Sequence, residues 1–161
     1  MASMALDDIA EYHNDVVASL KLYFSFGRRP DEVAVELTDR LEETDLRSSF
    51  VVLARLEAAF RIDYEYRCQK RMKDDLSRAF RAIYKSRKTR VSLEEDIFEA
   101  WRKNSTGSSR LIGELRGAFK FRHWLAHGKY WRPKLGRKCD FPYVYLLAEN
   151  VLSALPLCEP T

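Results

Sequence analysis

Glycine and proline are scarce in this chain, with 6 glycines and 5 prolines among 161 residues. Because these two residues end helices and form turns, their scarcity favours helical structure. Long apolar runs are also missing, and no stretch approaches the roughly 20 apolar residues of a membrane-spanning helix. The opening residues, MASMALDDIAEY, have no apolar signal core. We therefore expect a cytoplasmic protein without a membrane partner.

Cysteine is rare as well. Cys68, Cys139 and Cys158 form no C-x-x-C pair, and an odd, scattered set is typical of reduced thiols. The residues next to them do not indicate an activated nucleophile. The sequence therefore predicts neither a disulfide framework nor a Cys–His catalytic pair.

Apolar and charged residues are both abundant. Hydrophobic residues make up 46% of the chain, which is enough for a packed core and excludes a disordered polymer. The 28 lysines and arginines slightly exceed the 24 acidic residues, so the charge permits an anionic partner without requiring one. The basic residues gather in two runs, KSRKTR (85–90) and RPKLGRK (132–138).

Apolar residues recur every three or four positions along most of the chain, which is the spacing of amphipathic helices. The sequence contains neither a hairpin pattern nor an internal repeat. This pattern predicts an all-α helical bundle that forms a single domain over residues 1–161. The expected helices cover residues 6–26, 31–43, a long segment from 45, 72–84, a segment from the capping sequence SLEE (92–95) to near 104, 109–127 and 143–155.

The stretch KFRHWLAHGKYW (120–131) brings an arginine and two histidines to the end of a helix, where Gly128 is a natural stop. Arg122 continues an apolar line formed by Leu111, Leu115 and Ala118. A second line of the same helix is basic and is expected to face solvent or an anion. It holds Arg116, Lys120, His123 and His127.

Two structural explanations compete with a catalytic one. An arginine at the end of an apolar stripe extends its charge outward, and a histidine in the last helical turn is favoured by the helix dipole. The H-x-x-x-H spacing of His123 and His127 would suit zinc, but a third ligand is missing, and Trp124 stands where a metalloprotease has its glutamate. We expect no metal ion and no other cofactor.

The segment RHWLAH resembles the R-x4-H motif of the HEPN superfamily. A polar residue after the arginine, here His123, and a glycine after the histidine, here Gly128, are common in that superfamily. An all-α chain with the motif at the end of a late helix is similar to it in architecture. The resemblance implies a HEPN-like helical bundle that acts as a metal-independent endoribonuclease. It also implies a homodimer that brings two motifs to one cleft.

The resemblance assigns catalysis to Arg122 and His127, and a supporting role to His123. The chemistry fits, because an imidazole can take the proton of the RNA 2′-hydroxyl or protonate the leaving 5′-oxygen, while a guanidinium binds phosphate oxygens. The expected product is a 2′,3′-cyclic phosphate. Such an enzyme would be a toxin or a host-defence effector, and its partners would be RNA, a second copy of the chain and, for a toxin, an antitoxin protein.

The spacing of the motif has a geometric consequence. At about 100° per residue, Arg122 and His127 are about 140° apart around an ideal helix. One copy does not easily aim both side chains at a single phosphate. Two copies related by a two-fold axis would present their motifs from opposite sides of a shared cleft.

Glu57 shares an apolar helical face with Leu53 and Phe60, and a carboxylate in such a place requires a partner. HEPN proteins often hold the motif arginine with an acidic or polar residue of an earlier helix, so Glu57 is a candidate to orient Arg122. A pair with Arg61, four residues further along, is the alternative.

Residues around and after the motif are candidates to bind RNA, the cations through phosphates and the aromatic ring by stacking. They are Lys120, Lys129, Tyr130, Arg132, Lys134, Arg137 and Lys138. Alternatively, Tyr130 and the neighbouring Trp131 pack against the protein and anchor the loop. The cations would then only face solvent.

Three other functions stay open. The first is a HEPN module that binds RNA or dimerises without catalysis. The second is a toxin regulated by a nucleotidyltransferase partner, which modifies a tyrosine two residues after the motif histidine in some HEPN toxins. This chain has Lys129 there, with Tyr130 one position later. The third is a helical scaffold with a coincidental motif, which predicts a monomer or a dimer with distant His127 side chains.

Overall fold

The computed structural model of the chain describes residues 5–26, 30–88, 90–128 and 139–158. In these ranges all regular structure is helical, which confirms the prediction of an all-α bundle. The elements are α1 (Leu6–Phe24), α2 (Pro30–Gln69), α3 (Asp75–Arg87), the π-helical turn η1 (Leu93–Ile97), α4 (Phe98–Asn104), α5 (Ser108–Ala126) and α6 (Phe141–Ala154).

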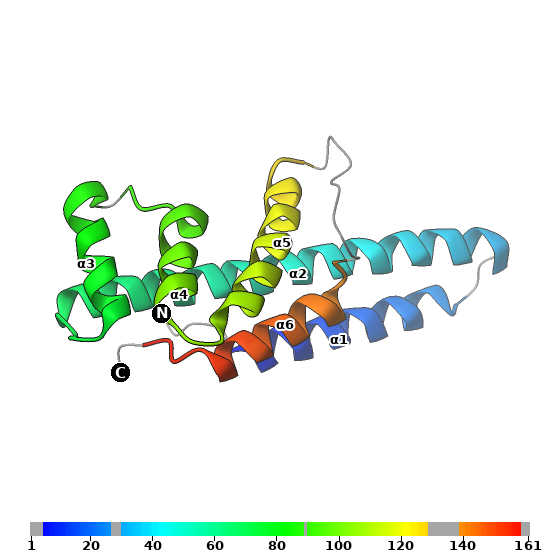
Figure 1. Cartoon of the computed structure of the whole chain (residues 1–161). Helices are drawn as coiled ribbons and strands as arrows, with labels where there is room; N and C mark the ends of the chain where they lie inside the picture. Colours follow the sequence, from blue (N-terminus) through cyan, green and yellow to red (C-terminus); the bar gives the residue numbers. More distant parts are fainter. Residues whose placement is uncertain (1–4, 27–29, 89, 129–138, 159–161) are drawn as a thin grey trace.

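Helix α2 runs along the whole length of the molecule (Figure 1). Helices α1 and α6 lie along one side of it, and α3, α4 and α5 stand across it. The buried apolar side chains form one cluster to which every helix contributes, with ring contacts from Phe60 to Phe98 and Trp101 near its centre. Among the described helices, none combines the length and the apolar character needed to cross a bilayer.

The two helices expected over 31–43 and from 45 are one helix, so the predicted break near Asp45 is wrong. The segment around the predicted break, LEETDLRS (41–48), contains no glycine or proline that would end a helix. The Thr44 hydroxyl donates to the Arg40 carbonyl (2.8 Å) within the helix. Asp45 does not cap a new helix, because its carboxylate lies 3.5 Å from Nε2 of His13 on α1.

A capping side chain also moves one predicted helix start. Helix α3 begins at Asp75 rather than at Met72, because the Asp74 carboxylate accepts the Ser77 N–H (3.0 Å). The basic run 85–90 was expected at the end of this helix or in the loop beyond it, and its residues Lys85 and Arg87 lie in the last turn of α3, with Lys88 as the C-cap.

The capping sequence SLEE closes differently from the prediction. The Ser92 hydroxyl accepts the Glu95 N–H (3.2 Å), but the reciprocal bond runs from the Ser92 N–H to Asp96 (2.8 Å), one residue beyond the expected glutamate. This wider closure accompanies the π-helical turn that precedes α4.

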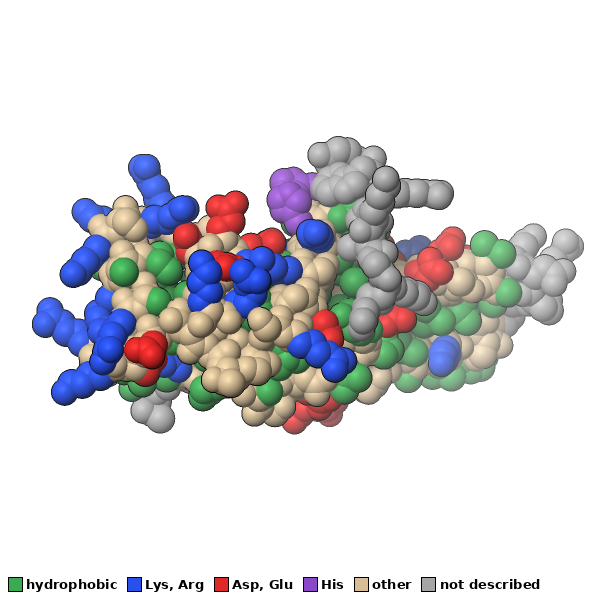
Figure 2. Space-filling view, viewed as in Figure 1, with side chains coloured by type: hydrophobic (Ala, Val, Ile, Leu, Met, Phe, Trp, Pro, Cys, Tyr) green, Lys and Arg blue, Asp and Glu red, His purple; other side chains and the backbone are tan. Residues whose placement is uncertain are grey.

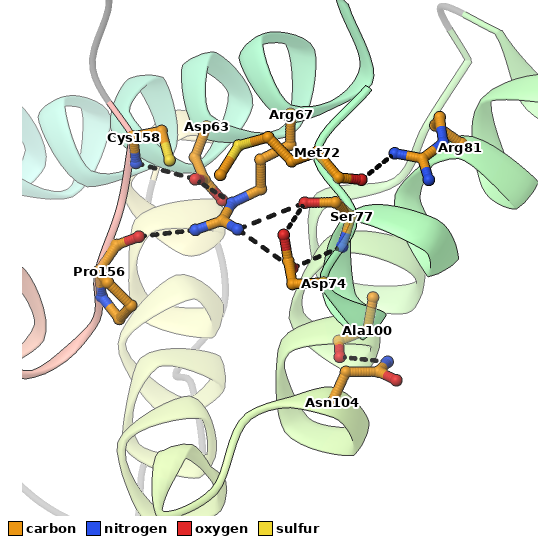
Figure 3. Close-up of polar contacts among 10 residues, drawn as sticks. All are labelled: Asp63, Arg67, Met72, Asp74, Ser77, Arg81, Ala100, Asn104, Pro156 and Cys158. Carbon is orange, nitrogen blue, oxygen red and sulfur yellow. Dashed lines mark hydrogen bonds and ion pairs between the residues drawn. The ribbon is translucent and has the colours of Figure 1, made fainter. Parts of the chain in front are cut away.

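A buried network around Arg67 joins three parts of the chain (Figure 3). The guanidinium donates to Asp63 on α2 (2.6 Å), to Asp74 before α3 (3.3 Å) and to the Pro156 carbonyl after α6 (2.7 Å). The Cys158 N–H donates to the Asp63 carboxylate (2.9 Å). Burial raises the pKa of Asp63, against the effect of these donors. The network fixes the end of α2 against α3 and the segment after α6.

His13 occupies a second buried polar site, where α1, α2 and α6 meet. Its Nδ1 lies 2.9 Å from the Ser48 hydroxyl, and its ring stacks on Phe141 with 3.8 Å between ring centroids. Burial lowers the pKa of His13, while the nearby Asp45 carboxylate acts in the opposite direction. The folded protein therefore favours the neutral imidazole.

Replacing Asp63 with alanine is expected to lower the free energy of unfolding by about 3–5 kcal/mol, because the Arg67 charge would stay buried without its partner. Denaturant unfolding followed by circular dichroism measures this loss. The double variant Asp63→Leu/Arg67→Met should lose less than the single variant, since no charge remains buried. Arg110→Ala, at an exposed position, is the control. A loss below about 1 kcal/mol for Asp63→Ala would contradict this account of the network.

The pKa of His13 also predicts a pH dependence of stability. As the pH falls below 6.5, the ordinary pKa of histidine, the unfolded chain binds the proton before the folded chain does. Stability that is present above pH 6.5 is therefore lost as the pH falls through this range. In the His13→Gln variant, the free energy of unfolding should differ less between pH 7 and pH 5 than it does in the unmodified protein. Identical pH profiles for the two proteins would show that His13 does not contribute.

Candidate active site

The end of α5 presents the motif found in the sequence. The helix ends at Ala126, and Gly128 adopts φ +76°, a left-handed conformation that glycine accepts without strain. The His127 N–H donates to the His123 carbonyl (3.1 Å), and the Gly128 N–H donates to the Leu125 carbonyl (3.3 Å). The predicted stop at Gly128 is therefore confirmed, and His127 lies where the helix ends.

The two lines predicted along α5 lie largely as expected. Leu115 and Ala118 are buried and Arg122 is partly buried, whereas Lys120, His123 and His127 are exposed. Arg116 is the exception on the basic line, because it does not simply face solvent. Its Nη2 donates to the Glu94 carbonyl and to the Glu99 carboxylate, each at 3.0 Å. Arg116 therefore attaches α5 to the elements before it.

Glu57 contacts both of the arginines considered for it. One carboxylate oxygen lies 2.7 Å from Nη2 of Arg122, and the other accepts Nε of Arg61 at 2.9 Å. The two alternatives therefore occur together in one pair of ion pairs. With the Glu57 side chain 19% exposed and that of Arg122 30% exposed, the contact is partly shielded from water. It joins the middle of α2 to the last turns of α5.

Phe50 is a part of the site that the sequence did not indicate. The Arg122 guanidinium carbon lies 5.5 Å from the centre of the Phe50 ring, a cation–π distance. Nε of Arg122 is buried and has no hydrogen-bond partner among the described residues. Phe50 precedes Glu57 by seven residues, so the helical period places both on one side of α2. That spacing was the available signal, but it does not tell which side chain of α5 lies opposite.

A pocket of about 370 Å³ lies beside Arg122. It is lined by Glu57, Arg61, Ser92, Leu93, Glu94, Glu95, Phe119, Arg122 and His123. Among the described residues, the lining holds three carboxylates and two guanidinium groups, so these residues do not make the pocket strongly positive. No sequence pattern indicated that Glu94 and Glu95 would lie near the motif, because they approach it only through the fold.

The two motif histidines lie together at the end of α5. Their ring centroids are 4.2 Å apart, at an interplanar angle of 59°. His123 lines the pocket with Arg122, whereas His127 is not part of that lining. The space-filling view shows histidine side chains at the free end of α5 (Figure 2). The structure therefore brings together Arg122, His123 and Glu57, with His127 adjacent to His123.

Of the residues expected to bind RNA, Lys120 is exposed on α5. The others, Lys129, Tyr130, Arg132, Lys134, Arg137 and Lys138, lie outside the described residues.

The cysteines are free thiols rather than disulfides. Burial raises the pKa of both Cys68 and Cys158, which keeps these thiols protonated and weakly nucleophilic. In the described part of the chain, no group of three or more His, Cys, Asp or Glu side chains is arranged to hold a metal ion.

Comparison of the chain with protein-family models, with curated proteins and with solved structures gave no match.

Proposed function

We propose that this protein is a HEPN-type, metal-independent endoribonuclease that acts in the cytoplasm as a toxin or host-defence effector. The observation that carries the proposal is the ion pair between Glu57 and Arg122, which holds the motif arginine in the pocket that His123 also lines, with His127 next to His123. A guanidinium and an imidazole that line one pocket are suited to binding and cleaving a phosphodiester.

In the proposed reaction the RNA supplies its own nucleophile. The 2′-oxygen attacks phosphorus and loses its proton to a base, the P–O5′ bond breaks, and the 5′-oxygen takes up a proton. This gives a 2′,3′-cyclic phosphate and a 5′-hydroxyl. His127 is the proposed proton-transfer group, His123 supports it, and Arg122 donates to the charged phosphate oxygens. Glu57 would position Arg122 without touching the substrate.

A composite site formed by two copies of the chain would supply positive charge to the pocket. The described residues that line it contain more carboxylates than guanidinium groups, which disfavours a phosphate unless further positive charge is supplied. A second motif facing the first would add both cations and imidazoles.

The carboxylates of Glu94 and Glu95 beside Arg122 favour a second candidate, a HEPN module that binds RNA or dimerises without cleaving. In that case Arg122 would be held in place for an interface, and the histidines would be solvent-exposed helix-end residues. The two candidates differ in one measurable property, which is cleavage of the RNA strand.

Purified protein is expected to cleave a 5′-labelled RNA in the presence of EDTA and to leave cyclic phosphate ends. His127→Ala should lower the rate by about 10²–10⁴-fold through loss of proton transfer, and Arg122→Ala by about 10²–10³-fold through loss of charge stabilisation. Glu57→Gln should lower it by up to about 10²-fold through misplacement of Arg122. Gel analysis of the products measures each rate.

Arg110→Ala is the matched control for Arg122→Ala, because Arg110 lies on the same helix with its side chain 90% exposed. This variant should cleave like the unmodified protein. Equal cleavage by the unmodified protein and His127→Ala would rule out the proposed nuclease. Binding of RNA without any cleavage would favour the second candidate.

Mixing two inactive variants tests whether the site is composite. If motifs from two copies share one cleft, a heterodimer of Arg122→Ala and His127→Ala retains one intact arginine and one intact histidine in that cleft. The mixture should therefore recover activity that neither variant has alone. Native mass spectrometry verifies that heterodimers form. Heterodimers that stay as inactive as the separate variants would refute the shared cleft.

A further inference from the structure

The positive charge of the chain is concentrated at the turn between α2 and α3 and along α3. Residues 70–90 contain nine lysines and arginines but only two acidic residues, a formal charge of +7. The whole chain carries +4, so the remaining residues are net negative. Figure 2 shows Lys and Arg side chains gathered over α3, at the end of the molecule away from α5. Such a concentration is typical of a surface that meets a polyanion.

This basic region is hollowed rather than flat. A cavity of about 850 Å³, here called the α2–α3 pocket, opens between the end of α2 and α3. Its lining includes Glu65 and Cys68 from α2, Arg71 from the turn, and Arg81, Tyr84 and Lys85 from α3. The volume is in the upper part of the range for ligand-binding pockets. Three cations and one aromatic ring therefore face the same cavity.

The cations of the α2–α3 pocket are not neutralised within the fold. Among the described residues, Arg71, Arg81 and Lys85 form no ion pair, and Arg81 donates only to the uncharged Met72 carbonyl (Figure 3). Arginines elsewhere on the surface do pair with carboxylates, as Arg102 does with Glu99. Glu65 is the one carboxylate of the lining. The pocket therefore retains net positive charge that is available to a ligand.

Besides its cations, the α2–α3 pocket contains the aromatic ring of Tyr84. Its side chain lines the pocket beside Lys85, and the residue is 48% exposed, which is high for a large aromatic ring. An exposed ring next to cations matches the way in which proteins hold single-stranded nucleic acid, with bases stacked on rings and phosphates on Lys and Arg. An acidic peptide would use the cations alone.

We propose that the α2–α3 pocket is a second binding site for single-stranded RNA, separate from the cleavage site. Phosphates would contact Arg71, Arg81 and Lys85, and a base would stack on Tyr84. The identity of the strand rests on the proposed ribonuclease function, whereas the affinity for a polyanion rests on the charge and shape of the pocket. The site would hold the substrate at a distance from the bond that is cut.

The two sites lie along the same helix. Glu57, Arg61 and Cys68 fall within about 40° of one another around α2, so both pockets open toward one side of it. From Glu57 to Gln69 the helix rises about 18 Å. At about 3.4 Å per nucleotide of a stacked strand, this distance corresponds to roughly five nucleotides. A strand longer than that can occupy both sites at once, and a trinucleotide cannot.

The test measures binding of a fluorescein-labelled single-stranded 12-nucleotide RNA by anisotropy, in a His127→Ala background that prevents cleavage. Arg71→Asn/Lys85→Gln removes two charges from the pocket, and asparagine tolerates the positive φ (49°) of Arg71. Affinity should fall about 20-fold at 0.1 M salt, and the slope of log K against log salt should fall by about 1.4. The control Arg40→Gln/Arg110→Gln removes the same charge from exposed positions and should bind like the parent. Equal losses in both double variants would overturn the proposal.

Tyr84 separates RNA from other polyanions. Tyr84→Leu should weaken binding of the RNA at least 5-fold, while Tyr84→Phe, which keeps the ring, should not. Neither change should affect binding of inorganic polyphosphate, which has no bases. If a labelled oligoglutamate binds as tightly as the RNA and Tyr84→Leu has no effect on either, the pocket binds an acidic protein and the RNA proposal is wrong.

Substrate length separates this proposal from the proposed nuclease. In the cleavage-competent protein, the pocket variants should raise the KM for the 12-nucleotide strand more than the KM for a trinucleotide, because a trinucleotide at the cleavage site does not reach the α2–α3 pocket. If the unmodified protein cleaves RNA but the pocket variants bind the long strand normally, the second site is refuted and the nuclease stands. If it does not cleave and the pocket variants still lose affinity, the nuclease is refuted and the RNA site stands.

Discussion

Helix α2 is continuous, and its length sets the positions of the helices that pack against it. Its 40 residues extend about 60 Å, and α1, α3, α5 and α6 all pack against it. Such a helix is stabilised chiefly by packing of its apolar side, which here carries fully buried residues such as Leu53, Leu56 and Phe60. Because the backbone does not break, the polar groups along it keep fixed separations. Both the ion pair at Glu57 and the buried network at Asp63 depend on that regularity.

The two ion pairs of α2, Asp63–Arg67 and Glu57–Arg122, have different roles. The Asp63–Arg67 contact is almost fully buried, and it connects segments that are far apart in the chain, so its role is to hold the fold together. The Glu57–Arg122 contact is partly exposed and lines a pocket. A partly exposed ion pair contributes less to the stability of the fold than a buried one. A contact of the second kind fixes the direction of a guanidinium, which is what a site for phosphate requires.

The distribution of charge divides the surface into two regions of opposite character. Carboxylates from η1 line the pocket of the motif arginine, whereas the cations that line the α2–α3 pocket form no ion pair among the described residues. In the part of the chain that the structure describes, the positive charge available to a polyanion is therefore greater at α3 than beside the motif. If the motif cleaves RNA, the basic end of the molecule would serve to hold the strand.

The helical class, the end of α5 at Gly128 and the two lines of side chains along that helix could be predicted from the sequence, because they follow from local periodicity and from the backbone freedom of glycine. The sequence also singled out Glu57, since a carboxylate on an apolar stripe requires a partner, although it could not choose between Arg61 and Arg122. The fold was needed to show that both arginines bind Glu57, that Phe50 lies under Arg122 and that η1 brings Glu94 and Glu95 to the pocket. The unbroken α2 agrees with the absence of glycine and proline around Asp45, but the contact between Asp45 and His13 of α1 is visible only in the fold. Contacts between residues distant in the chain depend on how helices cross, and helical periodicity carries no information about crossing.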